Sequence, residues 1–198
     1  MLKTPNIFHQ PDSIFVLVNK TFPLPNNYVP QNMCIPNVPF DTVTYTEKKF
    51  MHTEAAKALE NLFAAAYKEK IFLCAISGYR SFQRQEELYH TSVQTNGIEH
   101  ARLFSALPGC SEHQTGLAMD VSAASVDFQL EQSFSETIEG VWLAEHAFSF
   151  GFVLRYPKGK EKITGYAYEP WHLRYLSIPL AYYLKKENLV LEEYVYSL

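Results

Sequence analysis

The sequence predicts an α+β fold in a single domain, in which helices pack on one side of a small antiparallel sheet. The chain has 198 residues, 47% of them hydrophobic, which is enough for one domain with a sizeable core. Segments with the spacing of amphipathic helices alternate along the chain with short apolar runs typical of buried strands. No internal repeat or low-complexity segment interrupts this order.

Residues 1–40 are predicted to be an irregular segment that wraps around the domain, because Pro and Asn crowd residues 23–39. The next element is a helix over residues 53–68, which Thr53 is expected to cap. Its apolar side chains fall on one stripe: Leu59, Leu62, Phe63, Ala66 and Tyr67. Residues 71–76 form a nearly continuous apolar run, which predicts a buried strand.

Glycines mark the ends of the next two predicted helices. The first covers residues 82–94, after Gly78 breaks the preceding strand and before Gly97 ends the helix. The second covers residues 138–150 and is closed by Gly151. A polar loop is expected between the two helices, after one more strand.

The remaining strands are predicted in four places: residues 118–122, 152–155, 164–168 and 171–175. The last three of them are expected to belong to one sheet. Residues 177–198 are expected to form a C-terminal helical segment. Ser177 and Pro179 suit the N-terminus of a helix, so its helix is placed over residues 180–187.

Two short motifs contain residue types that bind and use a metal ion. The first reads Ser-Glu-His-Gln-Thr-Gly-Leu-Ala-Met-Asp and ends at Asp120; the second reads Glu-Pro-Trp-His and ends at His172. Together with His113, these two residues can fill three corners of a zinc tetrahedron and leave the fourth for a water, as in catalytic zinc sites. Glu169 lies close to one ligand in the sequence and can take the proton of that water. The motifs predict a metallohydrolase.

The setting of Asp120 supports its role as a ligand. Between residues 117 and 122, apolar side chains alternate with small or polar ones, which is the two-residue period of a strand. Since the apolar set faces the core, Asp120 projects from the opposite face. Gly116 supports a sharp turn that can bring His113 over that face.

Glu169 and His172 need a local irregularity if they are to share one site. In a regular strand, residues three apart point to opposite faces of the sheet. Pro170 excludes the interior of a helix for this segment. The two side chains therefore meet only if the chain bends or bulges near Pro170.

Four motifs occur in an order that resembles the VanY-type D-alanyl-D-alanine carboxypeptidases, zinc peptidases that trim bacterial cell-wall peptides. They are Ser-Gly-Tyr-Arg-Ser (residues 77–81), the motif that ends at Asp120, Gly-Phe-Val-Leu-Arg-Tyr-Pro (residues 151–157) and Glu-Pro-Trp-His-Leu-Arg-Tyr (residues 169–175). The resemblance extends from about Val18 to about Tyr175. Several ordered motifs over most of the chain are far more specific than a single match.

The resemblance implies a Hedgehog/D,D-peptidase-like fold and one Zn²⁺ per chain. It implies His113, Asp120 and His172 as zinc ligands and Glu169 as the general base, and the sequence does not depart from the family at these four positions. The expected reaction is removal of the C-terminal D-Ala from bacterial peptidoglycan peptides or precursors, at the D-Ala-D-Ala bond. The water is activated by the metal, so no serine or cysteine nucleophile is required.

Five further residues are expected to contact the substrate. Arg80 lies at a strand-to-helix turn, where its charge can meet the terminal carboxylate of the substrate or the developing oxyanion. Gln85, about one helical turn further on, points to the same side. Ser111, Tyr156 and Trp171 are expected to line the substrate pocket, and the resemblance supports these contacts.

Three other functions stay open at this point. The enzyme can be an L,D-carboxypeptidase that acts on tetrapeptide stems, or a dipeptidase that cleaves free D-Ala-D-Ala. A function of another class is a non-catalytic zinc-binding module, as in the related Hedgehog domains. Retention of Glu169 argues against the module, because a binding protein has no use for a base there.

Charge and cysteine content restrict the partners and the compartment. The net charge of −4 gives no basic surface for nucleic acid, and no apolar run is long enough for a transmembrane helix. The three cysteines, Cys34, Cys74 and Cys110, are an odd number and do not form a disulfide framework. Cys110 stands three residues before His113, yet it has no second partner for a structural metal site.

The beginning of the sequence bears on the compartment. It shows no secretory signal peptide, so a cytoplasmic monomer is expected; the alternative is an extracytoplasmic enzyme whose export segment has been removed. The partners expected for either case are peptidoglycan stem peptides or their precursors.

Overall fold

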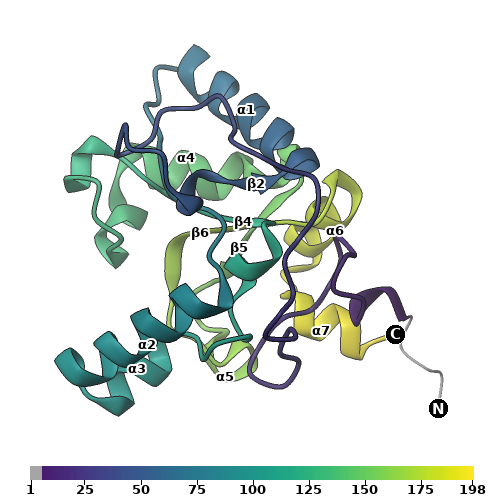
Figure 1. Ribbon diagram of the computed structural model, residues 1–198. Coiled ribbons are helices and arrows are strands. Elements are labelled where there is room, and N and C mark those ends of the chain that lie inside the picture. The colour runs from purple at the N-terminus through teal and green to yellow at the C-terminus, as the bar shows by residue number, and fades with distance from the viewer. Residues whose placement is uncertain (1–5) are drawn as a thin grey trace.

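A four-stranded antiparallel sheet with the strand order β3-β4-β6-β5 lies at the centre of the molecule. The computed structural model describes residues 6–198, and Figure 1 shows their arrangement. The strands are β3 (Cys74–Ser77), β4 (Ala118–Ser122), β5 (Phe152–Tyr156) and β6 (Glu169–Tyr175). β6 lies between β4 and β5, and all of its residues are buried. The α+β class and the small antiparallel sheet are those predicted from the sequence.

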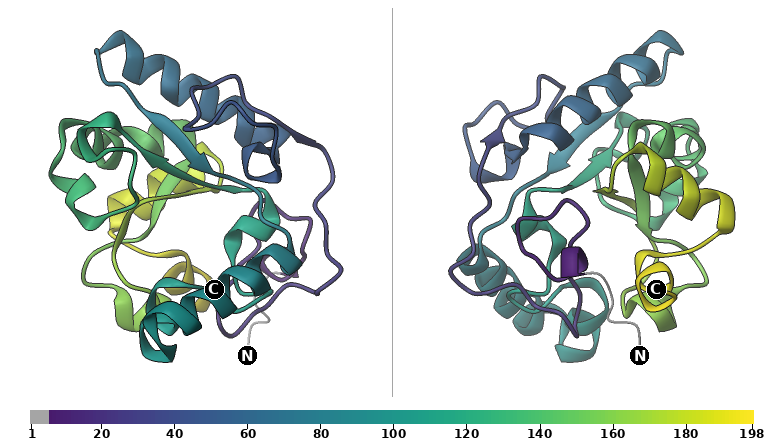
Figure 2. Two further views of the ribbon diagram at one scale, coloured as in Figure 1. Left: turned by 60° about the vertical axis from the view of Figure 1, so that its left-hand side comes forward. Right: turned by 90° about the vertical axis from the view of Figure 1, so that its right-hand side faces the viewer.

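Two helices cover one face of this sheet and complete the main hydrophobic core. α1 (Thr53–Lys68) and α4 (Ile138–His146) lie on the same side of the sheet in Figures 1 and 2. α1 occupies the residues predicted for it, because most of its apolar stripe, with Leu59 at the centre, is buried in the core. Tyr67 was expected in that stripe, but it is 70% exposed. Met119 of β4 and Leu173 of β6 project into the same core and are fully buried.

Two further helices lie on the opposite side of the sheet, below it in Figure 1. They are α2 (Phe82–Asn96) and α3 (Ile98–Phe104), separated by Gly97, whose φ of +81° is rarely adopted by other residues. Ser81 caps α2 by accepting a hydrogen bond from the backbone N–H of Arg84. The sequence predicted α2 but gave no indication of α3.

The C-terminal helices α6 (Ile178–Glu187) and α7 (Leu191–Tyr196) form a second, smaller core at the β5 edge. α6 begins two residues before its predicted start. The N-terminal segment packs against these helices, and Leu17 is buried among their apolar side chains. Residues far apart in the sequence are therefore joined beside β5.

The rest of the described chain contains only short elements. Two of them are the strands β1 (Met33–Cys34) and β2 (Met51–His52), which pair with each other, and a third is the short helix α5 (Glu161–Thr164). The 3-10 turns are η1 (Asn6–Phe8), η2 (Glu47–Lys49), η3 (Glu112–Thr115), η4 (Ala124–Val126), η5 (Gln132–Glu136) and η6 (Ala147–Phe150). Within residues 6–40 the elements are η1 and β1.

Several element predictions were wrong in detail. Residues 164–168 do not form a strand, because α5 ends at Thr164 and Gly165 turns the chain with a φ of +78°. Thr53 does not cap α1; its hydroxyl instead donates to the carbonyl of Asn32 and ties the helix to the N-terminal segment. The helix predicted over residues 138–150 is α-helical only to His146 and continues as η6.

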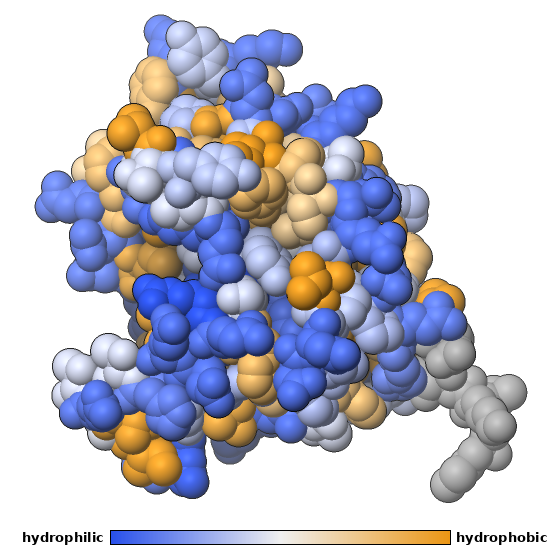
Figure 3. All heavy atoms as spheres, in the orientation of Figure 1, coloured by the Kyte–Doolittle hydropathy of each residue, from blue (hydrophilic) through white to orange (hydrophobic). Residues whose placement is uncertain are grey.

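None of the described helices is both long and apolar enough to cross a bilayer. On the face seen in Figure 3, hydrophilic residues predominate and the hydrophobic ones are divided into small separate groups.

Candidate metal centre and active site

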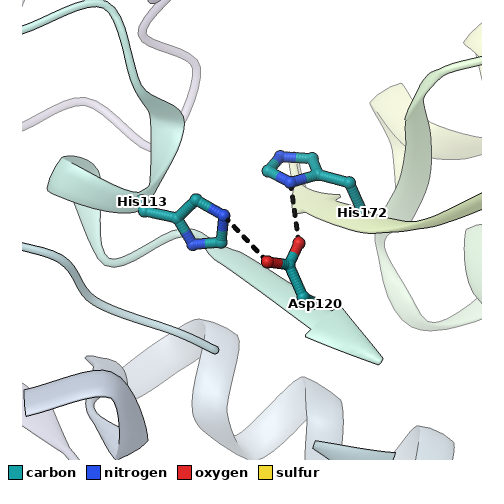
Figure 4. Close-up of side chains that lie close together, drawn as sticks. All are labelled: His113, Asp120 and His172. Atoms are coloured by element: carbon teal, nitrogen blue, oxygen red, sulfur yellow. Dashed lines mark hydrogen bonds and ion pairs between the residues drawn. The ribbon is translucent and has the colours of Figure 1, made fainter. Parts of the chain in front are cut away.

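Three side chains from different elements converge on one face of the sheet. Asp120 on β4 and His172 on β6 are direct cross-strand partners, so both project from the same face. His113 comes from η3 and its ring points toward Asp120, as Figure 4 shows. One ligand atom from each of the three lies within 4.8 Å of the others, and all three residues are buried.

Each oxygen of the Asp120 carboxylate faces one imidazole. Oδ2 lies 3.2 Å from Nε2 of His113, and Oδ1 lies 2.9 Å from Nδ1 of His172. The other ring nitrogen of His113, Nδ1, is 2.7 Å from the carbonyl oxygen of Gly78. A carbonyl only accepts, so Nδ1 carries the proton and Nε2 presents its lone pair to the site. Two imidazoles and a carboxylate arranged in this way fit a zinc ion with one open position.

Two glycines make this arrangement of His113 possible. Gly116 ends η3 with a φ of +70°, in the left-handed region that most residues avoid, and so turns the chain from η3 into β4. Gly78 follows β3, where a Cβ atom would lie 2.6 Å from the carbonyl oxygen of Phe50. Only a residue without a side chain can approach this closely, and the carbonyl of Gly78 is thereby held against the His113 ring.

Glu169 reaches the same site through an irregularity in β6. Leu154 pairs with Leu173, whereas Tyr156 pairs with Glu169, so β6 has two more residues than β5 in this interval. The extra residues lie next to Pro170, where the sequence required a bend. As a result Oε2 of Glu169 is 3.9 Å from Nδ1 of His172, although the two residues are three apart.

The pKa shifts of His172 and Asp120 indicate that the site favours positive charge. Burial opposes the charged form of His172, but the hydrogen bond to Asp120 and the nearby carboxylate of Glu112 outweigh it and raise its pKa to about 9. Burial lowers the pKa of His113. Burial works against ionised Asp120 too, yet the two imidazoles hold its pKa well below the usual range. A carboxylate that keeps its charge between two buried imidazoles suits a bound metal cation.

Glu169 is suited to accept a proton. Burial raises the pKa of its carboxyl to about 8, and the negative charge of Asp120 acts in the same direction, while His172 and Arg80 oppose it. Its side chain is only 11% exposed, and it lines the pocket described below. Since a cation bound between His172 and Asp120 favours its ionised form, the carboxylate is available as a base near neutral pH.

The site opens into a pocket of about 570 Å³. Arg80, Ser111, Tyr156, Glu169 and Trp171 line it together with the three candidate metal ligands. The outer part is formed by α3 and by the segment just before and within η5. Of the residues expected to contact substrate, four therefore line this pocket.

Gln85 is placed differently from the expectation. Its side-chain oxygen accepts a hydrogen bond from Nη1 of Arg80 at 2.8 Å, and its amide donates to the carbonyl of Ala106 at 2.7 Å. Gln85 is fully buried and is absent from the pocket lining. Because both of its polar groups are used inside the protein, it holds Arg80 in place behind the pocket wall. Ser77 supplies a second contact to the guanidinium.

Cys110 lies outside the group of candidate ligands. The group of metal-binding side chains within the described residues contains His113 but not Cys110. The cysteine is buried and free, and its backbone carbonyl accepts a hydrogen bond from the hydroxyl of Tyr166. This placement agrees with the low rank that sequence spacing gave it.

A buried charge network that was not predicted from the sequence lies beside the site. Arg155 and Arg174 are both fully buried and both donate to Glu112, and Arg155 also pairs with Glu192 of α7. The available signal was the presence of an arginine in each of two predicted strands. A buried arginine needs a carboxylate partner, so arginines at two strand positions indicate such a network.

Comparison with known proteins gives a consistent picture. The family model described as "VanY: D-alanyl-D-alanine carboxypeptidase" matches residues 48–178. YodJ of Bacillus subtilis (strain 168) is 46% identical over 184 residues, which cover 93% of this chain and 67% of that protein. The bifunctional D-Ala-D-Ala dipeptidase and D-Ala-D-Ala carboxypeptidase VanXYC of Enterococcus gallinarum is 36% identical over 180 residues, which cover 90% of this chain and 91% of that protein.

Solved structures show the same similarity in three dimensions. The LdcB LD-carboxypeptidase superimposes with a TM-score of 0.89 at 46% identity, covering 93% of this chain and 86% of that one. A mutant of the vancomycin-resistance D,D-pentapeptidase VanY from a VanB-type cassette, solved in complex with Zn(II), gives a TM-score of 0.72 at 32% identity, covering 91% of this chain and 97% of that one. At 46% and 32% identity, the chain resembles these two proteins in sequence as well as in fold.

Proposed function

The chain belongs to the family of VanY D-alanyl-D-alanine carboxypeptidases, and from this premise we propose that it is a zinc exopeptidase that releases the C-terminal D-Ala of peptidoglycan stem peptides or precursors. One observation carries the proposal. His113, Asp120 and His172 present ligand atoms to one point, and the buried carboxylate of Glu169 lies beside it in a pocket of about 570 Å³.

We assign His113, Asp120 and His172 as the ligands of one zinc ion. The assignment is supported by the convergence of their ligand atoms and by the carbonyl of Gly78, which orients the first imidazole. When bound in such a site, zinc lowers the pKa of a coordinated water and polarises a carbonyl group. The rest of the catalysis falls to side chains of this chain.

Glu169 is assigned as the general base. It takes a proton from the attacking water and delivers it to the leaving amine of D-Ala, so that the same carboxyl serves both halves of the reaction. Its burial supports this role, because a proton accepted there is not lost to bulk solvent. Tyr156 and Trp171 line the pocket on this side and are expected to exclude water around the substrate.

Arg80 is assigned to the negative charge of the substrate. Its guanidinium lines the pocket and is held by Gln85 and Ser77, so little side-chain entropy is lost on binding. It meets either the terminal carboxylate or the oxyanion that forms at the scissile carbonyl. If Arg80 binds the terminal carboxylate, the enzyme depends on a substrate with a free C-terminus. If Arg80 stabilises the oxyanion, it does not, so an amidated peptide distinguishes the two roles.

A second candidate bond is favoured by a specific observation. LdcB, described as an LD-carboxypeptidase, is more similar to this chain than the D,D-pentapeptidase VanY is, in sequence identity and in TM-score. An L,D-carboxypeptidase removes the last D-Ala from a tetrapeptide stem, where the preceding residue has the L configuration at the scissile carbonyl. The metal, base and arginine serve both bonds, so the outer pocket decides between them.

The deciding experiment offers four peptides to the zinc-loaded enzyme and measures released D-Ala. They are an acyl-D-Ala-D-Ala peptide, the same peptide amidated, a tetrapeptide stem with one terminal D-Ala, and free D-Ala-D-Ala. Release from the first supports the D,D-carboxypeptidase, preference for the third supports the L,D-carboxypeptidase, and preference for the fourth supports a dipeptidase. A charged hydrogen bond contributes about 1.5–3 kcal/mol, so amidation is expected to slow hydrolysis roughly ten- to a hundredfold if Arg80 binds the terminal carboxylate.

A metal test separates an enzyme from a non-catalytic zinc-binding module. His172→Ala is expected to lose zinc and activity together, measured by metal analysis and by D-Ala release, while circular dichroism shows that the fold remains. Full zinc occupancy in this variant would contradict the ligand assignment. Wild-type protein that binds zinc but turns over none of the four peptides would favour the binding module.

We further propose that the enzyme is a cytoplasmic monomer. The three cysteines Cys34, Cys74 and Cys110 are free, as expected for a protein in a reducing compartment. The alternative is a protein that acts outside the membrane on the mature wall. Cell fractionation against a cytoplasmic and a secreted marker tests the compartment, and light scattering with size-exclusion chromatography tests the oligomeric state.

A further inference from the structure

Glu112 occupies an unusual position directly beneath the metal centre. It precedes His113 in η3, and its side chain is completely buried. One carboxylate oxygen, Oε1, accepts hydrogen bonds from Arg155 and from Arg174, both at 2.8 Å. The other oxygen, Oε2, has no hydrogen-bond partner among the described residues.

The unpaired oxygen of Glu112 faces an unpaired nitrogen. Nε2 of His172 lies 3.5 Å from Oε2, and this nitrogen also has no partner in the described part of the chain. Buried polar atoms without partners are costly, and here two complementary ones stand opposite each other. A small rotation of the ring brings the pair within hydrogen-bond distance.

The opposite nitrogen of the same ring points into the metal centre. Nδ1 of His172 is 2.9 Å from Asp120 and 3.9 Å from Glu169. A neutral imidazole has one N–H and one lone pair, so a carboxylate at Nε2 selects the form whose lone pair is on Nδ1. His113 is arranged the other way round, since the carbonyl of Gly78 holds its Nδ1 and leaves Nε2 for the metal.

The negative charge of Glu112 is maintained by its neighbours. Arg155 bridges it to Glu192 of α7 through bonds of 2.8 and 2.6 Å, and Arg174 also donates to the backbone carbonyl of Val16. Two arginines and two glutamates thus balance one another inside the protein. The same arginines fix the orientation of the carboxylate, because they occupy Oε1 and leave Oε2 turned toward His172.

We propose that Glu112 is a positioning residue, which holds the Nε2–H of His172 so that Nδ1 presents its lone pair to the metal. The inference rests on the proposed function in that it takes His172 as a zinc ligand. Carboxylates that accept the second N–H of a ligating histidine orient the ring and strengthen it as a donor. The network extends this support to α7, whose Glu192 steadies Arg155.

The substitution Glu112→Gln tests this role sharply. Its amide oxygen can still accept from both arginines, and its NH₂ group then faces Nε2 of His172. That nitrogen has to become an acceptor, so the proton moves to Nδ1 and blocks the ligand position. Glu192→Gln is the matched control, because it removes one buried negative charge from the same network without touching His172.

The readout is zinc affinity of the metal-free protein, measured by competition with a chromophoric chelator. Glu112→Gln is expected to weaken zinc binding about 10- to 100-fold, the usual effect of losing such a partner, whereas Glu192→Gln stays within about threefold of the wild type. Equal zinc affinities of the two variants would overturn the proposal. Wild-type protein that binds no zinc would instead refute the proposed function.

A measurement on the wild type covers the case in which Glu112→Gln does not fold. Nitrogen-15 NMR of the zinc-loaded protein distinguishes a ring that ligates through Nδ1 and carries a proton on Nε2 from the reverse form. We expect the first form for His172 and the second for His113. Ligation of His172 through Nε2 would overturn the proposal without any variant.

Discussion

At the scale of the single residue, Glu169 is the side chain that distinguishes catalysis from metal binding. Glu169→Ala is expected to lower kcat at least about a hundredfold, the usual scale for a general base, with zinc content and folding unchanged. Metal analysis and rates of D-Ala release on the same preparation check both parts. Glu169→Gln keeps the size of the side chain and is expected to be equally inactive. A variant with nearly wild-type kcat would show that the base lies elsewhere.

The candidate ligands and the buried network illustrate what single residues reveal. The position of Asp120 follows from the two-residue alternation of its strand, which places the carboxylate on the face opposite the core side chains. The role proposed for Gln85 does not follow, since spacing on a helix gives its side but not what lies there. The role of Glu112 was even harder to predict from the sequence, because its partners come from β5 and β6.

At the scale of elements, the end of β3 controls the metal centre through the backbone. Gly78→Ala places a methyl group 2.6 Å from the carbonyl oxygen of Phe50 and 2.9 Å from the methyl of Met119. The carbonyl of Phe50 belongs to the backbone and cannot rotate away as a side chain would. The chain at residue 78 therefore shifts, which disturbs the contact between its carbonyl and His113. Overpacking of this kind costs about 1–3 kcal/mol. We expect a lower Tm together with weaker zinc binding.

Gly159→Ala is the control for this substitution. Its φ is +87°, so alanine is strained there, but no atom lies within 4 Å of the added methyl group. It is expected to lower Tm slightly and to leave zinc affinity unchanged. If Gly78→Ala also kept its zinc affinity while losing stability, the carbonyl of Gly78 would not be needed to orient His113.

The bulge in β6 shows why element prediction succeeds only in part. The run of apolar and aromatic residues predicts a strand, and Pro170 predicts an irregularity in it. The size of the irregularity is set by the pairing of Tyr156 with Glu169, which depends on β5. Residues 164–168 were mistaken for a strand because their aromatic content is strand-like, whereas Gly165 turns the chain.

At the scale of the whole molecule, the network around Glu112 links folding to pH. Burial raises the pKa of this carboxyl, but Arg155 and Arg174 outweigh burial and hold it well below the ordinary 4.5. A carboxyl whose pKa is lower in the folded than in the unfolded protein stabilises the fold at pH values above its unfolded-state pKa. This contribution is lost as the pH falls toward the folded-state pKa. The free energy of unfolding of the zinc-free protein is therefore expected to fall steadily below about pH 4.5. Urea titrations at several pH values measure it.

The variant Glu112→Gln serves as the control for the pH dependence. It lacks the titrating carboxyl, so its unfolding free energy is expected to change less between about pH 5 and pH 2 than that of the wild type. Asp120 titrates in both proteins and leaves a residual slope. Identical slopes for the two proteins would show that Glu112 is not coupled to folding in this way.

The sequence by itself determined the α+β class, α1 and most of the strands, because hydrophobic periodicity is local and is written in consecutive residues. It also singled out His113, Asp120, Glu169 and His172, because their chemistry is rare in combination. The tertiary structure alone decided how these four approach one another. That geometry depends on the register of β4 with β6, on the bulge in β6 and on the close approach of Gly78.

The same division explains the network beneath the site. Arg155 and Arg174 appear in the sequence as single arginines in two strands, without any sign of their partners. Only the fold brings Glu112 from η3 and Glu192 from α7 against them. Ion pairs between distant segments have no periodicity to reveal them, since the fold alone brings their segments together, and so the structure was needed to find the support of His172.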